Sequence, residues 1–137
     1  MRHENIVVRS LTEQDLYAVK AIDAESGNSV AEMLEDHGYA WGAFLNDILA
    51  GYCTLGGSED YDELDGHVLC DVYVLPLYRN RGIAAHLIQE AISQSISNCD
   101  CDTKVFLTIL DDGLQRFYKK LGFTYTGNGI MVKDCIA

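Results

Sequence analysis

The sequence has little proline and no long apolar run. Pro76 is its single proline, and no apolar run reaches the ~18 residues of a membrane-spanning helix. The first ten residues, MRHENIVVRS, lack the apolar stretch of a signal peptide. We therefore expect a cytoplasmic protein with no membrane partner. With 137 residues, 48% of them hydrophobic, the chain is too short for two full domains, and we predict one domain over residues 1–137.

Cysteine spacing that would suggest zinc is absent. The chain has five cysteines, an odd number, without two CxxC pairs or a Cys/His pair at zinc spacing. We expect free thiols and no metal. Cys99 and Cys101 follow the central predicted helix, and a redox or metal role for them is the alternative.

Positive charge is scarce in the first half of the chain. Residues 1–65 hold 3 Lys/Arg and 14 Asp/Glu, whereas residues 66–137 hold seven of each, so the net charge of −11 arises in the first half. Nucleic-acid binding requires a basic surface, and we expect no such partner. The acidic half favours a cationic ligand, with solubility alone as the alternative explanation.

Apolar periodicity and turn residues predict seven strands and four helices. The strands are predicted at 6–9, 39–45, 48–55, 67–75, 104–110, 123–125 and 130–133, and the helices at 12–23, 29–38, 82–96 and 112–121. Their order is β-α-α-β-β-β-α-β-α-β-β. This order predicts an α/β fold in which helices cover the faces of a mixed sheet.

Capping residues mark three of the helix starts. Thr12, Ser29 and Asp112 each precede an acid or amide by three residues, the spacing of a capping box. Asn46-Asp47 separates two apolar runs and predicts an antiparallel hairpin. The acidic segment 56–66 is predicted to be a loop.

The stretch VLPLYRNRGIAAHLI, residues 74–88, predicts a strand, a turn and a helix start. The first turn of a helix has amide groups without partners and a partial positive charge, which together suit a phosphate. Gly82, Ala84 and Ala85 are small enough for an anion to approach the backbone, and Arg79 and Arg81 add positive charge. We predict a diphosphate site here. The alternative is a helix start with two solvated arginines and no ligand.

Other phosphate motifs do not fit this stretch. A P-loop requires Gly-Lys-Ser/Thr, which the sequence lacks. A dinucleotide fingerprint requires glycine at 80, 82 and 85, and only Gly82 complies.

Two segments match signatures of one enzyme family. RNRGIA, residues 79–84, fits Arg/Gln-x-x-Gly-x-Gly/Ala, and FYKKLGF, residues 117–123, fits Phe-Tyr-x-x-x-Gly-Phe. With these segments and the predicted element order, nearly the whole chain resembles the GCN5-related N-acetyltransferase (GNAT) family. The resemblance implies a mixed, mostly antiparallel sheet of about six or seven strands with about four helices, and acetyl-CoA as co-substrate.

The resemblance also implies where acetyl-CoA binds. The strand before the turn should diverge from its neighbour at a bulge, and Val74 and Leu75 should offer backbone groups beside it. Pro76 agrees with a lapse in pairing, since proline cannot donate a ladder hydrogen bond. The residues expected to bind the cofactor are Val74, Leu75, Arg79, Asn80, Arg81, Gly82, Ile83, Ala84, Ala85, Asp112 and Phe117.

Two proton transfers remain to be assigned. Tyr118 matches the family's general acid, and its alternative is a half-buried core aromatic. Asp71 is the candidate base, although strand alternation turns it away from Val74 and a structural role is equally open. A water chain ending at Glu32, Glu35, Tyr73 or His67 is the other route. Cys70 stands where some polyamine-acetylating relatives have glutamate, which makes their mechanism doubtful for this chain.

Two functions follow from the resemblance. The first is transfer of an acetyl group from acetyl-CoA to a primary amine, with a small cationic amine or a basic peptide end favoured by the acidic first half. The second is an acyl-CoA-binding regulatory protein without turnover, suggested by the missing glutamate at 70. The acceptor and the oligomeric state stay open, although a homodimer through the closing hairpin is common among relatives.

Overall fold

The computed structural model describes residues 5–35, 39–57, 67–99, 103–109 and 111–135. Within these ranges, the helices are α1 (Leu16–Ser26), α2 (Val30–Glu35), α3 (Ile83–Cys99) and α4 (Asp112–Lys120). The strands are β1 (Ile6–Ser10), β2 (Ala40–Leu45), β3 (Ile48–Gly57), β4 (His67–Val74), β5 (Thr103–Thr108), β6 (Thr124–Gly127) and β7 (Ile130–Cys135). The predicted α/β fold and element order are confirmed. Most of the predicted acidic loop, Cys101 and the side chain of Cys99 lie outside the described part.

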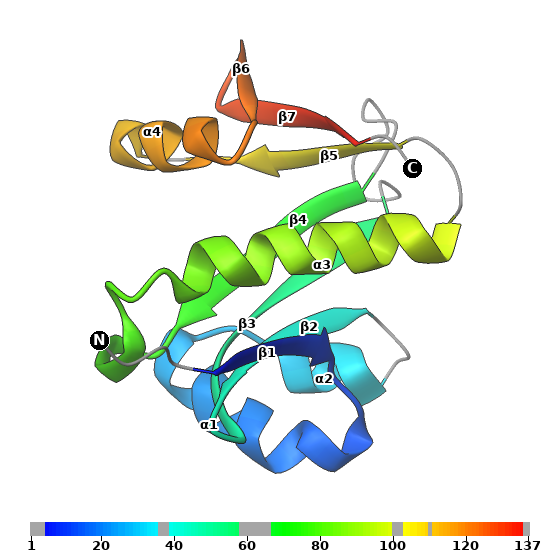
Figure 1. Cartoon of the computed structure of the whole chain (residues 1–137), viewed down its shortest axis with the longest axis vertical. Helices are drawn as coiled ribbons and strands as arrows, with labels where there is room; N and C mark the ends of the chain where they lie inside the picture. The colour runs from blue at the N-terminus through cyan, green and yellow to red at the C-terminus, as the bar shows by residue number, and fades with distance from the viewer. Residues whose placement is uncertain (1–4, 36–38, 58–66, 100–102, 110, 136–137) are drawn as a thin grey trace.

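The seven strands form one sheet in the order β1-β2-β3-β4-β5-β7-β6. Neighbouring strands are antiparallel except β4 and β5, which are parallel. This parallel pair is short, since only His67 and Val68 of β4 are registered with β5. Beyond Val68 the two strands separate, and the start of α3 lies at the end where they are apart (Figure 1). The sheet therefore opens between β4 and β5.

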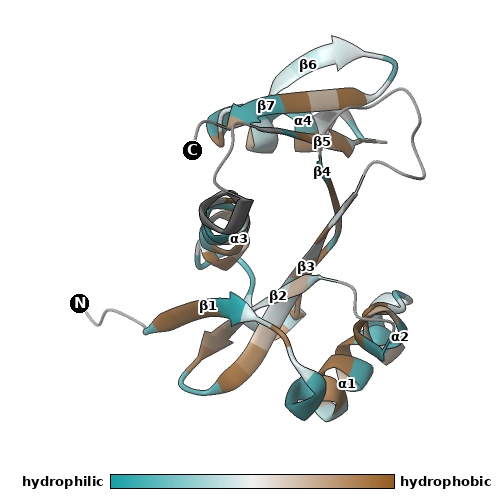
Figure 2. Ribbon diagram, turned by 90° about the vertical axis from the view of Figure 1, so that its right-hand side faces the viewer, coloured by the Kyte–Doolittle hydropathy of each residue, from teal (hydrophilic) through white to brown (hydrophobic). Residues whose placement is uncertain are grey.

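Helices cover both faces of the N-terminal part of the sheet. In Figure 2, α3 lies on one side of β1–β3, and α1 and α2 lie on the other. One apolar cluster contains Leu87 and Ile88 of α3 together with strand residues, and a second contains Val19 and Ile22 of α1 with Tyr52 of β3. Within the described ranges, no helix is long and apolar enough to cross a membrane.

A bulge interrupts β4 at Asp71. The register with β3 shifts here, and Asp71 adopts a left-handed backbone with φ of 54°. Leu69, Val72 and Val74 all pack in the α3 cluster, so a spacing of three replaces the usual two before Val72. Simple alternation therefore does not hold along this strand. The Asp71 carboxylate nevertheless accepts from Thr54, which lies between Cys53 and Leu55 of the α3 cluster and so points to the opposite face from Val74.

The predicted capping box at Thr12 forms, but it caps a 3₁₀ turn, Glu13–Asp15, that directly precedes α1, and α2 is capped differently from the prediction. Thr12 accepts from the amide of Gln14, and Asp15 accepts from the amide of Thr12, which completes a capping box. Ser29 was predicted to cap α2. The structure instead places the Asp23 carboxylate of α1 there, where it accepts from the first amides of α2 at 3.1 and 2.9 Å.

Asp23 also binds the sheet. The hydroxyl of buried Tyr52 donates to Asp23 at 2.6 Å, and burial, followed by this hydrogen bond, raises the pKa of Tyr52 to about 12. One carboxylate of the acidic half thus joins α1, α2 and β3. Its negative charge serves the fold.

The cap of α4 lies one residue before the predicted one. Asp111, not Asp112, accepts from the amide of Gly113 at 2.9 Å. Because of this, Asp112 is the first helical residue, and its side chain lies outside the described part. Leu114, predicted to lie on the apolar face of this helix, is 46% exposed.

Candidate active site

A cavity of about 320 Å³ lies where α3 begins. Most of the residues predicted to bind the cofactor line this cavity, and so does Tyr78, which was not predicted. The residues that line it are Val74, Tyr78, Arg79, Asn80, Gly82, Ile83, Ala84, Ala85 and Phe117. Phe117 comes from α4, so the cavity joins the two matched sequence segments across the opening between β4 and β5.

The turn before α3 leaves its first amides accessible. The amide of His86 donates to the carbonyl of Gly82 at 3.1 Å, the first bond of the helix, so the amides of residues 83–85 have no carbonyl partner within it. Gly82 is exposed, with φ of 77°, and a Cβ there would meet nothing within 4 Å. Asn80 has φ of 64°, a left-handed conformation that asparagine adopts more readily than most residues other than glycine.

The amide of Val74 points into the opening. The next residue, Leu75, donates to the carbonyl of Ala50 on β3 at 2.8 Å, and Val74 is registered with Gly51. In an antiparallel ladder, consecutive residues direct their backbone groups to opposite sides. The N–H and C=O of Val74 are therefore directed away from β3, toward the side where β5 has separated.

Leu75, in contrast, has no free N–H to offer a ligand. Its N–H binds Ala50, and its C=O accepts from the amide of Tyr78 at 2.9 Å. The predicted ligand role of Leu75 stays a prediction and would depend on the second lone pair of this carbonyl. Pairing with β3 continues through Leu75 and ends at Pro76, where a 3₁₀ turn begins, as predicted. On the other side of β4, pairing with β5 already ends after Val68.

Arg79 reaches back to the strand. Its Nε donates to the carbonyl of Val74 at 2.8 Å, and its guanidinium lies 5.1 Å from the centre of the Tyr73 ring. The sequence predicts that the positive charge of Arg79 lies beside a diphosphate. Arg81, the second arginine of the turn, does not line the cavity, and its guanidinium lies 5.8 Å from the centre of the Tyr78 ring.

Tyr118 is held in the core. Its side chain is 8% exposed and makes edge-to-face contacts with the rings of Phe117 and Phe123, at centroid distances of 5.0 and 5.7 Å. Burial, with a smaller effect from Cys53, raises the pKa of the Tyr118 phenol. The phenol is therefore protonated at neutral pH. This state is required of a general acid and is equally compatible with a packing role.

Asp71 is bound to a neighbouring strand. The hydroxyl of buried Thr54 on β3 donates to its carboxylate at 3.1 Å. Burial, followed by the charge of Asp71, raises the pKa of the Cys70 thiol, so this thiol is protonated at neutral pH and is a poor base. Of the alternative bases, Glu32 and Glu35 are exposed on α2.

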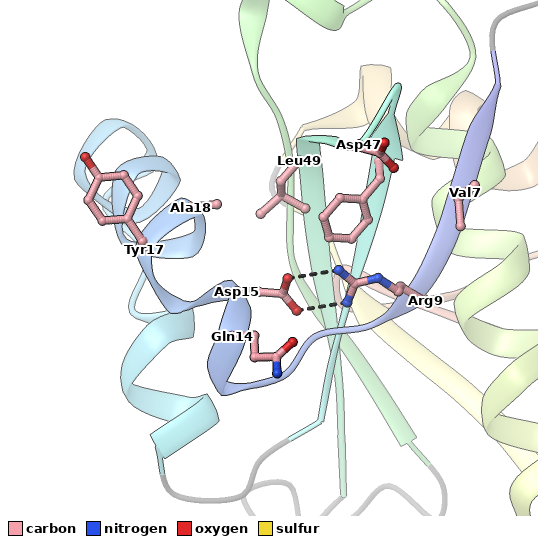
Figure 3. A pocket seen from close by; sticks show the side chains of 9 residues that line it. Val7, Arg9, Gln14, Asp15, Tyr17, Ala18, Asp47 and Leu49 are labelled. Atoms are coloured by element: carbon pink, nitrogen blue, oxygen red, sulfur yellow. Dashed lines mark hydrogen bonds and ion pairs between the residues drawn. The ribbon is translucent and has the colours of Figure 1, made fainter.

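A second cavity of about 400 Å³ lies against β1 and α1 (Figure 3), and its charged groups include Arg9, Asp15 and Asp47. Arg9 and Asp15 form two hydrogen bonds of 2.9 Å, and Asp15 also accepts from Thr12. The hydrogen bond with Arg9 lowers the pKa of Asp15 and raises that of Arg9. Because this pair satisfies its own charges, the smaller cavity at α3 is the better candidate for an active site.

Residue pairings across strands were missed by the sequence analysis. The hydrogen bond between Thr54 and Asp71 depends on the register of β3 against β4. The hydrogen bond between Arg79 and Val74 depends on the path of the turn. Neither contact has a local signal in the sequence. Tyr78 had a weak signal, since it is an aromatic residue directly before the arginine turn.

Comparisons with known proteins agree with this geometry. Residues 7–123 match the model of the acetyltransferase (GNAT) family, and the chain belongs to that family. This confirms the predicted family and class of enzyme, an N-acetyltransferase. No curated protein matches the chain.

Several solved structures share the fold. Escherichia coli YhbS in complex with CoA has a TM-score of 0.74 and 18% identity, covering 98% of this chain and 83% of that one. Arabidopsis thaliana NAA60 in complex with acetyl-CoA has a TM-score of 0.70 and 21% identity, covering 95% and 98%. The ribosomal-protein-alanine N-acetyltransferase of Brucella melitensis has a TM-score of 0.70 and 18% identity, covering 93% and 99%.

Proposed function

We propose that the protein transfers an acetyl group from acetyl-CoA to a primary amine by direct attack. The observation that carries this proposal is the cavity at α3, which joins the accessible amides of a helix start to the outward-facing amide of Val74. Solved structures with the same fold include YhbS in complex with CoA and NAA60 in complex with acetyl-CoA. Membership in an acetyltransferase family supports the same chemistry.

The helix start fits the diphosphate of coenzyme A. Residues 83–85 supply amide donors, Gly82 and the small side chains of Ala84 and Ala85 allow close approach, and the helix dipole favours an anion. Bound acetyl-CoA supplies an activated acetyl thioester. The residues of this turn bind and orient it.

The amide of Val74 would stabilise the transition state of acetyl transfer. Its amide faces the opening, where it can donate to the thioester carbonyl oxygen as negative charge develops there. A fixed backbone donor of this kind typically contributes about 10²–10³-fold to kcat. The geometry needs no movement of the strand, since the ladder with β3 already sets the direction of this N–H.

Proton transfer is assigned to Tyr118 and, in the other direction, to Asp71 or water. Tyr118 retains its proton at neutral pH and is proposed to donate it to the departing thiolate. An attacking amine with a pKa near ~10.4 must first lose a proton. Asp71 is the proposed base, and a water chain ending at Glu32, Glu35, Tyr73 or His67 is the alternative.

The acceptor is proposed to be a small cationic amine or a basic peptide end. The support is the excess of negative charge in residues 1–65. Part of that charge is committed to the fold, as Asp15 and Asp23 show. A single domain, cytoplasmic location and a homodimer stay predictions.

Calorimetry and a thiol-release assay test the proposal. The purified chain is titrated with CoA, then mixed with acetyl-CoA and a panel containing polyamines, aminoglycosides and peptides with basic N-termini. CoA binding with amine-dependent release of thiol is the expected result. Binding without release above background would favour the regulatory alternative, and absence of binding would refute the site itself.

A further inference from the structure

One hydrogen bond in the candidate site has no role so far, the one between Arg79 and Val74. The Nε–H of Arg79 donates to the Val74 carbonyl at 2.8 Å, five residues back along the chain. The guanidinium carbon of Arg79 lies over the Tyr73 ring, and the cation–π attraction also holds the side chain in place. The contact closes the Pro76–Tyr78 turn onto the end of β4.

This contact acts on one residue of special importance. The N–H and C=O of a strand residue point to the same side of the strand. In Val74 both point toward the opening, so the Arg79 guanidinium occupies the acceptor beside the amide that faces the substrate. The backbone rotation that would turn this amide away would also break the bond to Arg79.

Arg79 also keeps its positive charge available. Its hydrogen-bond acceptor is a neutral carbonyl, and no ion pair joins Arg79 to any carboxylate among the residues that the structure describes. The charge is thus held at the carbonyl of Val74, the residue whose amide would face the developing negative charge. Positive charge fixed at such a position favours the transition state.

We infer that Arg79 is a positioning residue for the Val74 amide, rather than chiefly a ligand of the diphosphate. The inference rests on the proposed function, because it assigns Val74 to the acetyl carbonyl. It predicts that Arg79 matters equally for a donor that has a diphosphate and for one that lacks it.

Two donors separate these roles. Acetyl-CoA carries the diphosphate, and S-acetylpantetheine carries the same thioester without it. Arg79→Met is expected to lower kcat by about 10²-fold with both donors, the effect of misplacing a catalytic group by about 1 Å. Arg79→Lys, which can donate to the carbonyl without stacking in the same way, should recover part of the loss. Arg116→Met, a change at an exposed arginine of α4, serves as the control.

The contrary outcome is equally specific. If Arg79→Met raises KM for acetyl-CoA and leaves turnover of S-acetylpantetheine as in the wild type, Arg79 is a diphosphate ligand and the inference is wrong. Arg81→Met, in the same turn, is expected to raise KM for acetyl-CoA more than Arg79→Met does.

A measurement without turnover distinguishes failure of the inference from failure of the proposed function. In ¹H–¹⁵N spectra, Arg79→Met should shift the Val74 signal and speed its amide exchange, while the Leu75 amide, bonded to Ala50, changes less. If wild type binds CoA without turnover yet these changes are seen, the proposed enzyme fails and the positioning contact stands. If Val74 does not respond in a folded variant, the inference is overturned.

Discussion

Arg9 and Arg79 occupy two regions built from similar parts. Each guanidinium lies over an aromatic ring, Phe44 at 4.1 Å and Tyr73 at 5.1 Å, and each lines a cavity. Arg9 gives two hydrogen bonds to the carboxylate of Asp15. Arg79 gives one to a neutral carbonyl.

The difference shows how the same type of side chain can connect two elements of the fold in one region and line a candidate active site in another. At β1 and α1 the positive charge is cancelled by a carboxylate that also caps a helix turn, so the region connects two elements and leaves little charge for a ligand. At α3, Arg79 donates to a neutral carbonyl, and the amides of residues 83–85 have no carbonyl partner within the helix. Catalytic stabilisation depends on such uncompensated donors.

Cavity size alone would have favoured the region beside Arg9 over the candidate active site at α3. The cavity beside Arg9, about 400 Å³, is larger than the one at α3, about 320 Å³. What distinguishes the smaller cavity is the set of backbone amides that reach it. A fold-stabilising region and an active site are therefore best separated by hydrogen-bond satisfaction.

Removing the Val74 amide tests the active-site region with the largest expected effect. Val74→Pro deletes an N–H that does not belong to the ladder with β3, so the strand pairing survives. We expect kcat to fall by about 10²–10³-fold in steady-state assays. Thermal unfolding of the variant is measured alongside, to show that the chain remains folded.

Leu75→Pro is the matched control for that change. Leu75 has φ of −56°, which proline adopts without strain, but its N–H binds Ala50. This variant should lose about 1 kcal/mol of unfolding free energy and show a much smaller loss of kcat. Equal losses of kcat in the two variants would show that the direction of the Val74 amide is unimportant.

Tyr118→Phe tests the proposed acid while keeping the aromatic packing with Phe117 and Phe123. We expect kcat to fall by about 10²-fold. Because burial raises the pKa of Tyr118, wild-type activity should persist below pH ~10 and decline as pH rises through the raised pKa. The variant should lack this alkaline decline. An unchanged kcat and pH profile would leave Tyr118 with a packing role only.

Two glycines extend the comparison to both regions. Gly82 before α3 and Gly27 after α1 have φ of 77° and 84°, and a Cβ at either would meet nothing within 4 Å. Alanine at each position should cost about 1–2 kcal/mol of stability through backbone strain alone. Only Gly82→Ala should also weaken CoA binding. We expect its Kd for CoA to rise by about tenfold, which corresponds to about 1.4 kcal/mol of binding free energy. Equal CoA affinity in the two variants, measured by calorimetry, would argue against a diphosphate at α3.

Local sequence signals predicted the frame of both regions. Thr12 and Asp15 form the expected capping box, and Asn46-Asp47 forms the expected turn, with φ of 52° and 68°. The RNRG turn was placed correctly between strand and helix. These features depend on residues within a few positions of each other, so the sequence contains the information directly.

Features that depend on pairing between distant segments were not predictable in this way. The bulge at Asp71 arises from the register of β4 against β3, and the cap of α2 comes from Asp23 seven residues earlier. Arg79, a residue of the motif itself, was expected beside a diphosphate, and its hydrogen bond to the strand was not predicted. Its direction depends on the path of the 76–78 turn, which residue type alone does not set.

The smallest expected effect concerns the structural region. Asp15→Asn removes the charge that binds Arg9 and weakens the capping box at Thr12, and we expect a loss of about 1 kcal/mol in unfolding free energy at pH 7. Turnover should be within a few-fold of the wild type, since Asp15 lies outside the α3 cavity.

The dependence of this loss on pH is set by the carboxylate. The hydrogen bond from Arg9 is the main cause that lowers the pKa of folded Asp15, so its contribution is fully present above the unfolded value of ~3.9 and disappears as pH falls through the lower folded value. Denaturant unfolding of wild type and Asp15→Asn should therefore differ at pH 7 and converge below pH ~4. A difference that persists unchanged into acid would mean that Asp15 contributes through packing, and the contrast with Arg79 would then rest on geometry rather than on charge.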